Sequence, residues 1–341
     1  MRVRRRSNNR VVALDLGAAA VQAVEATSSR GMVAAASIPR IDTEVGYDEA
    51  ELATIVAALR RRGFTAGEAA VILPKALLRF VPVDIPPPDS GAPVEQIARA
   101  QVAHERCEGA GFELALWIPT GADASQSERA VAVSCAHNDA DPLLDALQRA
   151  GLTPRSLHPP AAAIACAARI DDPARRVMLD AGWSGASVIV VEHGKVLFER
   201  SMGSHRFGRV VAEIGRALGV DAETARWVAG RGRNRDPALV GRMAPILRGF
   251  GERLAEDIAS SIAFIERCWP GEGLQVLDIV GGGGEDDDLI DWLDASIGPA
   301  VRPLMCRTVR HTATPAQSAA AGLALASVGA RTERASSEVA A

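Results

Sequence analysis

The sequence predicts an α/β protein in which one arrangement of strands is used twice. Apolar runs typical of strands alternate along the chain with segments whose apolar residues recur at helical spacing. The stretches "VVALDLGAAAVQ" (11–22) and "VMLDAGWSGASVIVV" (177–191) share one order of features: an apolar strand, an aspartate two residues before a glycine, and a second strand. The second stretch therefore repeats the opening arrangement of the chain.

The composition indicates a globular protein and excludes several functional classes. The chain has 341 residues, of which 48% are hydrophobic, enough for sizeable cores. Its net charge of −4 gives no overall positive field, so we expect no nucleic-acid partner. The five cysteines are odd in number and form no CxxC pair, which favours a reducing cytoplasm.

Two features of the charge and apolar patterns bear on the membrane. No segment approaches the ~18 uninterrupted apolar residues of a membrane span, and Asp15 and Gly17 interrupt the apolar run that could otherwise follow a basic leader, so we expect no export. The arginine-rich residues 1–10 are predicted to form a flexible arm, with a weak contact to a membrane surface or an acidic partner as the alternative. Lys75 and Lys195 are the only lysines, which we interpret as composition bias.

The first part of the chain is predicted to be a strand meander that leads into a helix. Strands are expected at 11–16, 20–26 and 31–38, a helix at 48–62 and a fourth strand at 69–74.

Residues 76–151 then form a self-contained β-α-β-β-α pattern. A strand in "LLRFVPVDIPPPD" is closed by prolines, "PVEQIARAQVAHE" has helical spacing, "FELALWIP" and "RAVAVSCA" are strands, and "DPLLDALQRAGL" is a helix that ends at Gly151.

The remaining elements follow the second occurrence of the hairpin. A helix at 159–170 precedes it. Further helices are expected at 207–218, 221–230, 239–267, 289–298 and 314–329, with a strand at 274–280, and residues from 331 onward are expected to be an unfolded tail.

Three motifs indicate a polyphosphate-binding site. Gly17 and Gly182 permit the backbone conformation in which amides face a phosphate, while Asp15 and Asp180 can hold a magnesium ion or its water shell. The glycine run between a strand and a helix offers a surface without side chains on which a base and ribose could lie; it consists of Gly281, Gly282, Gly283 and Gly284.

With these motifs the chain resembles the actin-like ATPase superfamily. The two hairpins resemble its phosphate motifs, and "DIVGGGGEDD" resembles its adenosine motif. Within the superfamily it is most similar to the type IV pilus assembly protein PilM family and the related competence and type II secretion proteins. Further support comes from "RFVPVDIP", "LLDALQRAGLTPRSLHPPAAAIACA", "VEHGKVLFERSMGSHRFG" and "TPAQSAAAGLALA".

The resemblance implies an actin-like (ribonuclease H-like) two-lobed α/β fold with a nucleotide cleft and a small inserted β-α-β-β-α subdomain, as in PilM and FtsA. The expected organisation is an arm at 1–10, a first lobe at 11–75 and 152–172 completed by a helix at about 314–328, an inserted subdomain at 76–151, a second lobe at 173–313 and a disordered tail at 331–341.

By the same resemblance, ATP with magnesium is the expected cofactor. Asp15, Gly17 and Gln22 would belong to the first phosphate loop, Asp180 and Gly182 to the second, and the glycine run to the adenosine loop. Glu223 falls where the family pattern has a glutamate that faces the nucleoside, and Arg226 replaces a lysine of that pattern.

Departures from the family pattern predict a weakened site. Ala18, Ala19, Ala20 and Gln22 stand where the family has hydroxyls and a lysine, and a charge-assisted hydrogen bond contributes about 1.5–3 kcal/mol. Trp183 occupies the place of a small residue and could crowd the phosphate. The acids at 285–288 are interpreted as helix N-terminal residues that compensate the helix dipole.

The resemblance implies a cytoplasmic scaffold of a type IV pilus or type II secretion-like machine, peripheral at the inner membrane through its partners. It would dock a short N-terminal peptide of a single-span inner-membrane protein beside the inserted subdomain and couple it to the assembly motor, with self-association as a further expectation. The strand at 77–86 and the helix at 95–103 are candidates for lining that groove, with burial in a core as the alternative.

Two other functions remain open. A sugar kinase or a polyphosphate or nucleotide phosphatase on the same fold would need a positioned base and more phosphate donors. An FtsA-like membrane-associated polymer would need a C-terminal amphipathic helix, and the tail has no apolar face. The sequence leaves enzyme activity uncertain and favours none beyond weak ATP hydrolysis.

Overall fold

The computed structural model describes residues 10–40, 46–87, 90–106, 111–118, 129–168, 175–229, 236–269, 274–308 and 311–338. Of the predicted arm only Arg10 lies within these residues, as the first residue of strand β1. No helix in this described part of the chain is long and apolar enough to cross a membrane.

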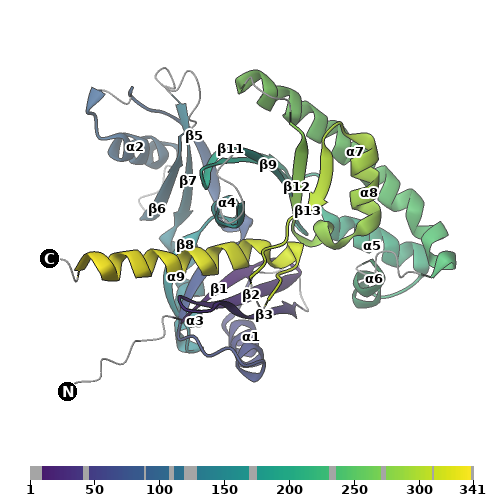
Figure 1. The fold of residues 1–341 in the computed structure, drawn as a ribbon, viewed down its shortest axis with the longest axis horizontal. Coiled ribbons are helices and arrows are strands. Elements are labelled where there is room, and N and C mark those ends of the chain that lie inside the picture. Colours follow the sequence, from purple (N-terminus) through teal and green to yellow (C-terminus); the bar gives the residue numbers. More distant parts are fainter. Residues whose placement is uncertain are drawn as a thin grey trace.

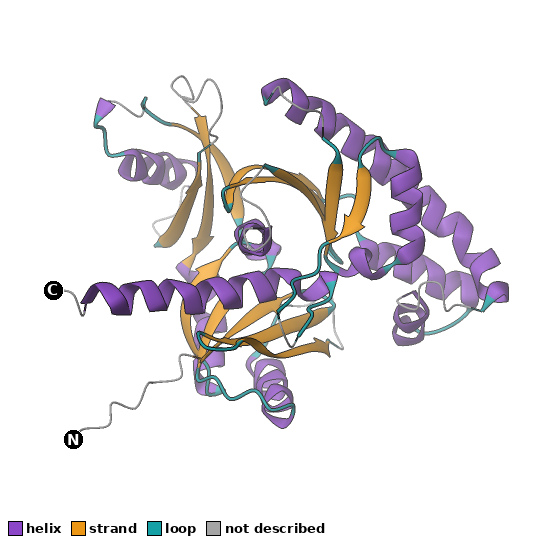
Figure 2. Ribbon diagram, viewed as in Figure 1, coloured by secondary structure: helices purple, strands orange, loops and turns teal. Residues whose placement is uncertain are grey.

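Two five-stranded sheets have the same strand arrangement (Figures 1 and 2). The first has the order β3-β2-β1-β4-β8 and consists of Arg10–Leu16 (β1), Ala20–Thr27 (β2), Gly31–Pro39 (β3), Glu68–Ile72 (β4) and Thr153–His158 (β8). The second has the order β11-β10-β9-β12-β13 and consists of Arg176–Ala181 (β9), Ala186–Glu192 (β10), Lys195–Met202 (β11), Val276–Val280 (β12) and Ala300–Pro303 (β13).

Pairing directions are the same in both sheets. In each, the first three strands along the chain form antiparallel pairs, and the first strand pairs in parallel with the fourth. Asp15 pairs with Gln22 across the first hairpin, and Asp180 pairs with Ser187 across the second. The repeat in the sequence is therefore a repeat of topology, as predicted.

Helices cover both sheets and fill the space between them. The first sheet carries Glu49–Arg61 (α1) and His137–Arg149 (α3), whose buried residues share a cluster with Leu14 and Val71. Pro160–Ala168 (α4) and Ser318–Glu338 (α9) pack on each other and on β1, β2, β10 or β11 (Figure 1). Their small residues are needed there, since a Cβ at Gly322 of α9 would lie 2.3 Å from the backbone nitrogen of Ala167.

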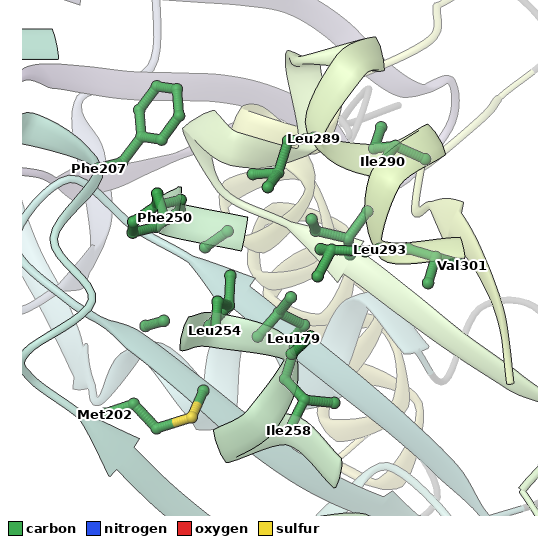
Figure 3. Packing of buried hydrophobic residues seen from close by; sticks show 14 of the residues in the cluster. Leu179, Met202, Phe207, Phe250, Leu254, Ile258, Leu289, Ile290, Leu293 and Val301 are labelled. Carbon is green, nitrogen blue, oxygen red and sulfur yellow. The ribbon is translucent and has the colours of Figure 1, made fainter. Parts of the chain in front are cut away.

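The second sheet has its own core, shown in Figure 3. Its helices are Phe207–Leu218 (α5), Ala222–Ala229 (α6), Pro237–Cys268 (α7) and Asp287–Ser296 (α8). Leu179 and Met202 from the sheet meet Phe250, Leu254 and Ile258 from α7 in this core.

A third, three-stranded sheet lies between β4 and β8 in sequence. It has the order β5-β7-β6, with Arg79–Asp84 (β5), Phe112–Trp117 (β6) and Arg129–Ala136 (β7), and Val94–Arg106 (α2) packs on it. The fifth element of the predicted β-α-β-β-α unit differs. Helix α3 packs on α1 and in the core of the first sheet, because its apolar face fits that larger core.

The C-terminal helix is longer than predicted. The chain was expected to unfold from residue 331, but α9 continues to Glu338. No proline or glycine interrupts residues 331–338, and their alanine, arginine and glutamate residues favour helix. Residues 339–341 lie outside the described part.

Candidate functional site

The two predicted phosphate hairpins face each other. Asp15 and Asp180 are the penultimate residues of β1 and β9, so each lies at the carboxyl end of a strand. Burial, with a smaller contribution from the nearby charge of Asp180, raises the pKa of Asp15 from 3.8 to about 7. The structure thus brings these two carboxyl groups, one from each sheet, into electrostatic contact.

Asp180 is surrounded by charged groups from both sheets. Burial raises the pKa of Asp180 to about 6; the charge of Lys75 opposes this rise and the charge of Glu199 adds to it. Lys75 Nζ lies 2.6 Å from Glu199 Oε1 and also donates to Ser187 Oγ. A lysine that follows the first sheet therefore neutralises part of the negative charge in the second.

The glycine run packs beside Asp180. Gly281 has a φ of 81°, and a Cβ there would lie 2.8 Å from Asp180 Oδ1. A Cβ at Gly283 would lie 2.6 Å from the Cβ of Ala181. After the run, the Asp286 carboxylate caps α8 by accepting from Leu289 N at 3.1 Å, so this acid acts as a helix N-terminal residue.

The backbone carbonyls of the first hairpin turn are bonded to the protein's own side chains. Tyr47 Oη donates to Gly17 O at 2.6 Å, and the Arg40 backbone N–H donates to Ala19 O at 2.9 Å. Arg40 is buried, is paired with Glu51 through two hydrogen bonds, and lies over the Tyr47 ring at 3.9 Å. These contacts fix the shape of the turn without a ligand.

Arg226 joins the two hairpin turns. From α6 it donates through Nη1 to Ala19 O at 3.1 Å, and its guanidinium lies 4.8 Å from the centre of the Trp183 ring. Burial lowers the pKa of Arg226, while the charge of Glu223 opposes this, although Glu223 itself is exposed. Arg226 thus bridges the space between the turns.

The second turn is closed by backbone bonds. Gly182 N–H donates to Gly185 O at 3.1 Å, and Gly208 N–H, in the first turn of α5, donates to Trp183 O at 3.0 Å. The Trp183 ring covers Gly208, where a Cβ would lie 2.6 Å from the indole. The amide of Gly182 and a first-turn amide of α5, which could have faced a phosphate, are therefore already paired.

This arrangement does not fit a magnesium triphosphate. The first turn offers alanines, Gln22 Oε1 is a buried acceptor without a hydrogen-bond partner in the described residues, and Arg226 is engaged by carbonyls. Burial is the main cause of the raised pKa values of both aspartates, and a neighbouring carboxylate adds to each. Within the described residues, no three His, Cys, Asp or Glu side chains are grouped to hold a metal ion.

Sequence reasoning missed two residues at this site. Lys75 donates to Ser187 Oγ, and Tyr47, which lies just before α1, donates to Gly17 O of the first hairpin turn. Lys75 is one of only two lysines in the sequence. This rarity could have drawn attention to it, but it was interpreted as composition bias. Tyr47, the only tyrosine of the chain, gave a similar compositional signal.

The two segments proposed to line a peptide groove bury their apolar side chains in the small subdomain's own core. Val81, Val83, Ala98 and Val102 form one cluster with Phe112. On β5, Pro82 has no N–H, and the N–H and C=O of Asp84 are bonded to the Gln101 side chain at 2.9 and 2.6 Å. Burial in a core, the alternative considered for these segments, is what the structure shows.

A hollow of about 550 Å³ lies between α5 and α7. The buried His205 ring bonds to Asp257 there, with Nε2 2.6 Å from Oδ2. Its rim carries Arg206, Arg209 and Arg253 together with acidic residues, so its charges largely cancel.

Comparisons with known proteins agree on the fold. No protein-family model and no curated protein sequence matches the chain. Among solved structures, a chain of a PilM-PilN type IV pilus biogenesis complex is similar over 93% of this chain and 98% of its own length, with 20% identity and a TM-score of 0.69.

Two other structures are similar over most of the chain. The ethanolamine utilization protein EutJ from Carboxydothermus hydrogenoformans matches with 16% identity and a TM-score of 0.56 over 93% of this chain and 89% of its own. MreB5 of Spiroplasma citri, bound to ADP, matches with 11% identity and a TM-score of 0.51 over 96% and 98%. With its two lobes of equal topology and its facing hairpins, the chain has the actin-like ATPase fold.

Proposed function

We propose that the protein is a cytoplasmic scaffold of a type IV pilus or type II secretion-like assembly machine, held at the inner membrane through its partners. The observation that supports this most is the match to the PilM-PilN complex chain over nearly the full length of both chains. On this proposal a short N-terminal peptide of an inner-membrane protein binds beside the inserted subdomain, and the scaffold links that protein to the assembly motor.

The cleft supports a scaffold better than an enzyme. A phosphoryl-transfer site depends on donors that are free to stabilise transferring phosphate. Here Arg226 is bonded to Ala19 O, and the amides beside Trp183 are paired within the protein. We therefore propose that the ATP site is degenerate, although MreB5 of the same fold binds ADP.

Two calorimetric titrations test the proposal. Titration of the purified protein with ATP and magnesium should give no binding heat at millimolar ligand, because the cleft donors are occupied. Titration with the synthetic N-terminal cytoplasmic peptide of a single-span protein encoded beside this one should give saturable binding. Tight ATP binding with turnover would contradict the degenerate site and support the kinase or phosphatase alternative. Failure of the peptide to bind would contradict the docking role.

A further inference from the structure

Lys75 lies where three parts of the molecule meet. It begins a short 3₁₀ turn, Lys75–Leu77, that follows β4 of the first sheet and precedes β5 of the small sheet. Within the described residues, its ammonium group forms no hydrogen bond with the strands of either of these sheets. It donates instead to Ser187 on β10 and Glu199 on β11, both in the second sheet.

Loss of Lys75 would leave its second-lobe partner Glu199 as a buried carboxylate without a compensating cation. The Glu199 side chain is only 5% exposed, and its Oε2 atom is buried without a hydrogen-bond partner in the described residues. A buried carboxylate is stable only when a cation compensates it. Ser187 is paired across the hairpin with Asp180, so the same lysine also faces the carboxylate of the second turn.

Lys75 also contacts the small sheet. Its Nζ lies 5.7 Å from the centre of the Phe80 ring on β5, and Phe80 packs on Trp117 of β6 at 5.6 Å between ring centres. Both rings pack with the buried cluster that contains Val191 and Val196 of the second sheet. One side chain therefore touches the small subdomain while it is bonded to the second lobe.

Arg226 crosses between the lobes in the opposite direction, but its acceptors are backbone carbonyls. Loss of Arg226 would leave neutral groups unpaired, whereas loss of Lys75 would leave a buried charge. Lys75 is therefore the stronger of the two connections.

We propose that Lys75 is a built-in tie that holds the two lobes and the small subdomain in one arrangement without a nucleotide. In this role the ammonium group supplies the positive charge that compensates the buried Glu199 carboxylate and the neighbouring Asp180. The proposal goes beyond the scaffold function, because the tie would fix the arrangement of the lobes whatever partner the protein has.

Hydrogen exchange of the full chain, followed by mass spectrometry, tests the tie. Lys75→Met removes the charge and keeps the length of the side chain. We expect amide exchange in β5, β10 and β11 to accelerate by about tenfold or more, because these strands lose their common contact, and the midpoint of thermal unfolding to fall by about 5 °C or more. Lys195→Met is the matched control, since Lys195 is an exposed lysine on the β10–β11 hairpin that carries Ser187 and Glu199.

A second variant keeps the test decisive if Lys75→Met does not fold. Glu199→Gln removes the buried charge and should accelerate exchange in the same three strands, and the double variant Lys75→Met/Glu199→Gln should be more stable than Lys75→Met alone. Exchange in these strands that is equal for the Lys75 and Lys195 variants, or unchanged in Glu199→Gln, would overturn the tie. Slowing of exchange in the wild-type strands by ATP and magnesium would also overturn it. None of these readouts uses the peptide, so they are independent of the docking role.

Discussion

At the scale of single residues, the two facing aspartates make stability depend on pH. The pKa of Asp15 is 3.8 in an unfolded chain and about 7 in the folded protein, so the folded state binds more protons between these values. Stability should therefore fall as pH rises from about 4 to about 7, and remain lower above that range. The cause is burial of the carboxylate next to Asp180.

Asp15→Asn tests this directly. The variant should match the wild type near pH 4 and exceed it above pH 7 by on the order of 1–3 kcal/mol, because the amide cannot acquire the buried charge. Denaturant unfolding at pH 4 and pH 8 measures the difference. Asp221→Asn is a control for which the pH dependence of stability has the opposite sign. Hydrogen bonds from Thr224 lower the pKa of Asp221, so this carboxylate adds stability as the pH rises. A loss of stability in Asp15→Asn at pH 8 would show that the carboxylate makes a favourable contact.

Individual site residues were predictable only where a local pattern specifies them. Asp15, Gly17, Asp180 and the glycine run stand at strand ends, and such positions can be read from strand patterns and turn residues. Lys75 could not be placed in this way, because its partners Ser187 and Glu199 are distant in sequence and no short-range pattern reports their contact. Arg226 was expected at the site through the family resemblance, but no short-range pattern reports its contact with Ala19 O of the first hairpin.

At the scale of elements, strand and helix positions followed the sequence more closely than their packing did. The hairpins around Gly17 and Gly182 agree with prediction to within a few residues, because alternation and turn residues are local signals. Helix α3 was placed with the wrong sheet. Its apolar spacing shows that it has a buried face, but the spacing contains no information about which core receives it.

The contact between α4 and α9 gives a prediction at this scale. A Cβ at Gly322 would lie 2.3 Å from Ala167 N and 2.5 Å from its Cα, and both are backbone atoms that cannot turn away. Gly322→Ala should therefore separate the helices and reduce the free energy of unfolding by about 1–3 kcal/mol, as overpacking does. Chemical denaturation measures the loss.

Gly329→Ala is the matched control in the same helix. Nothing lies within 4 Å of a Cβ at Gly329, so this change should leave stability unchanged or raise it by up to about 1 kcal/mol. Equal stability of the two variants would mean that α9 can shift along α4 without loss.

At the scale of the whole molecule, the small subdomain has a core on one face of its sheet and packs on the rest of the molecule through the other face. Its own core of Val81, Val83, Ala98, Val102 and Phe112 is separate from the cluster that joins the lobes. Phe80 and Trp117 connect the two, since they lie on the small sheet but pack with residues of the larger cluster. The subdomain can therefore stay folded even if its position relative to the lobes changes. A peptide bound beside the subdomain would depend on that position.

Trp117→Ala tests this separation of fold from position. Trp117 is 7% exposed, and truncating a buried tryptophan removes about 3–5 kcal/mol of packing. Because the subdomain keeps its own core, we expect hydrogen exchange to accelerate in β6 and in the facing strand β11, while amides in α2 and the second-lobe core remain protected. Trp227→Ala is the control, because Trp227 is 58% exposed and its truncation should cost under about 1 kcal/mol. Acceleration spread evenly over both lobes would contradict a separately attached subdomain, since it would mean that Trp117 supports the whole molecule as one cooperative unit.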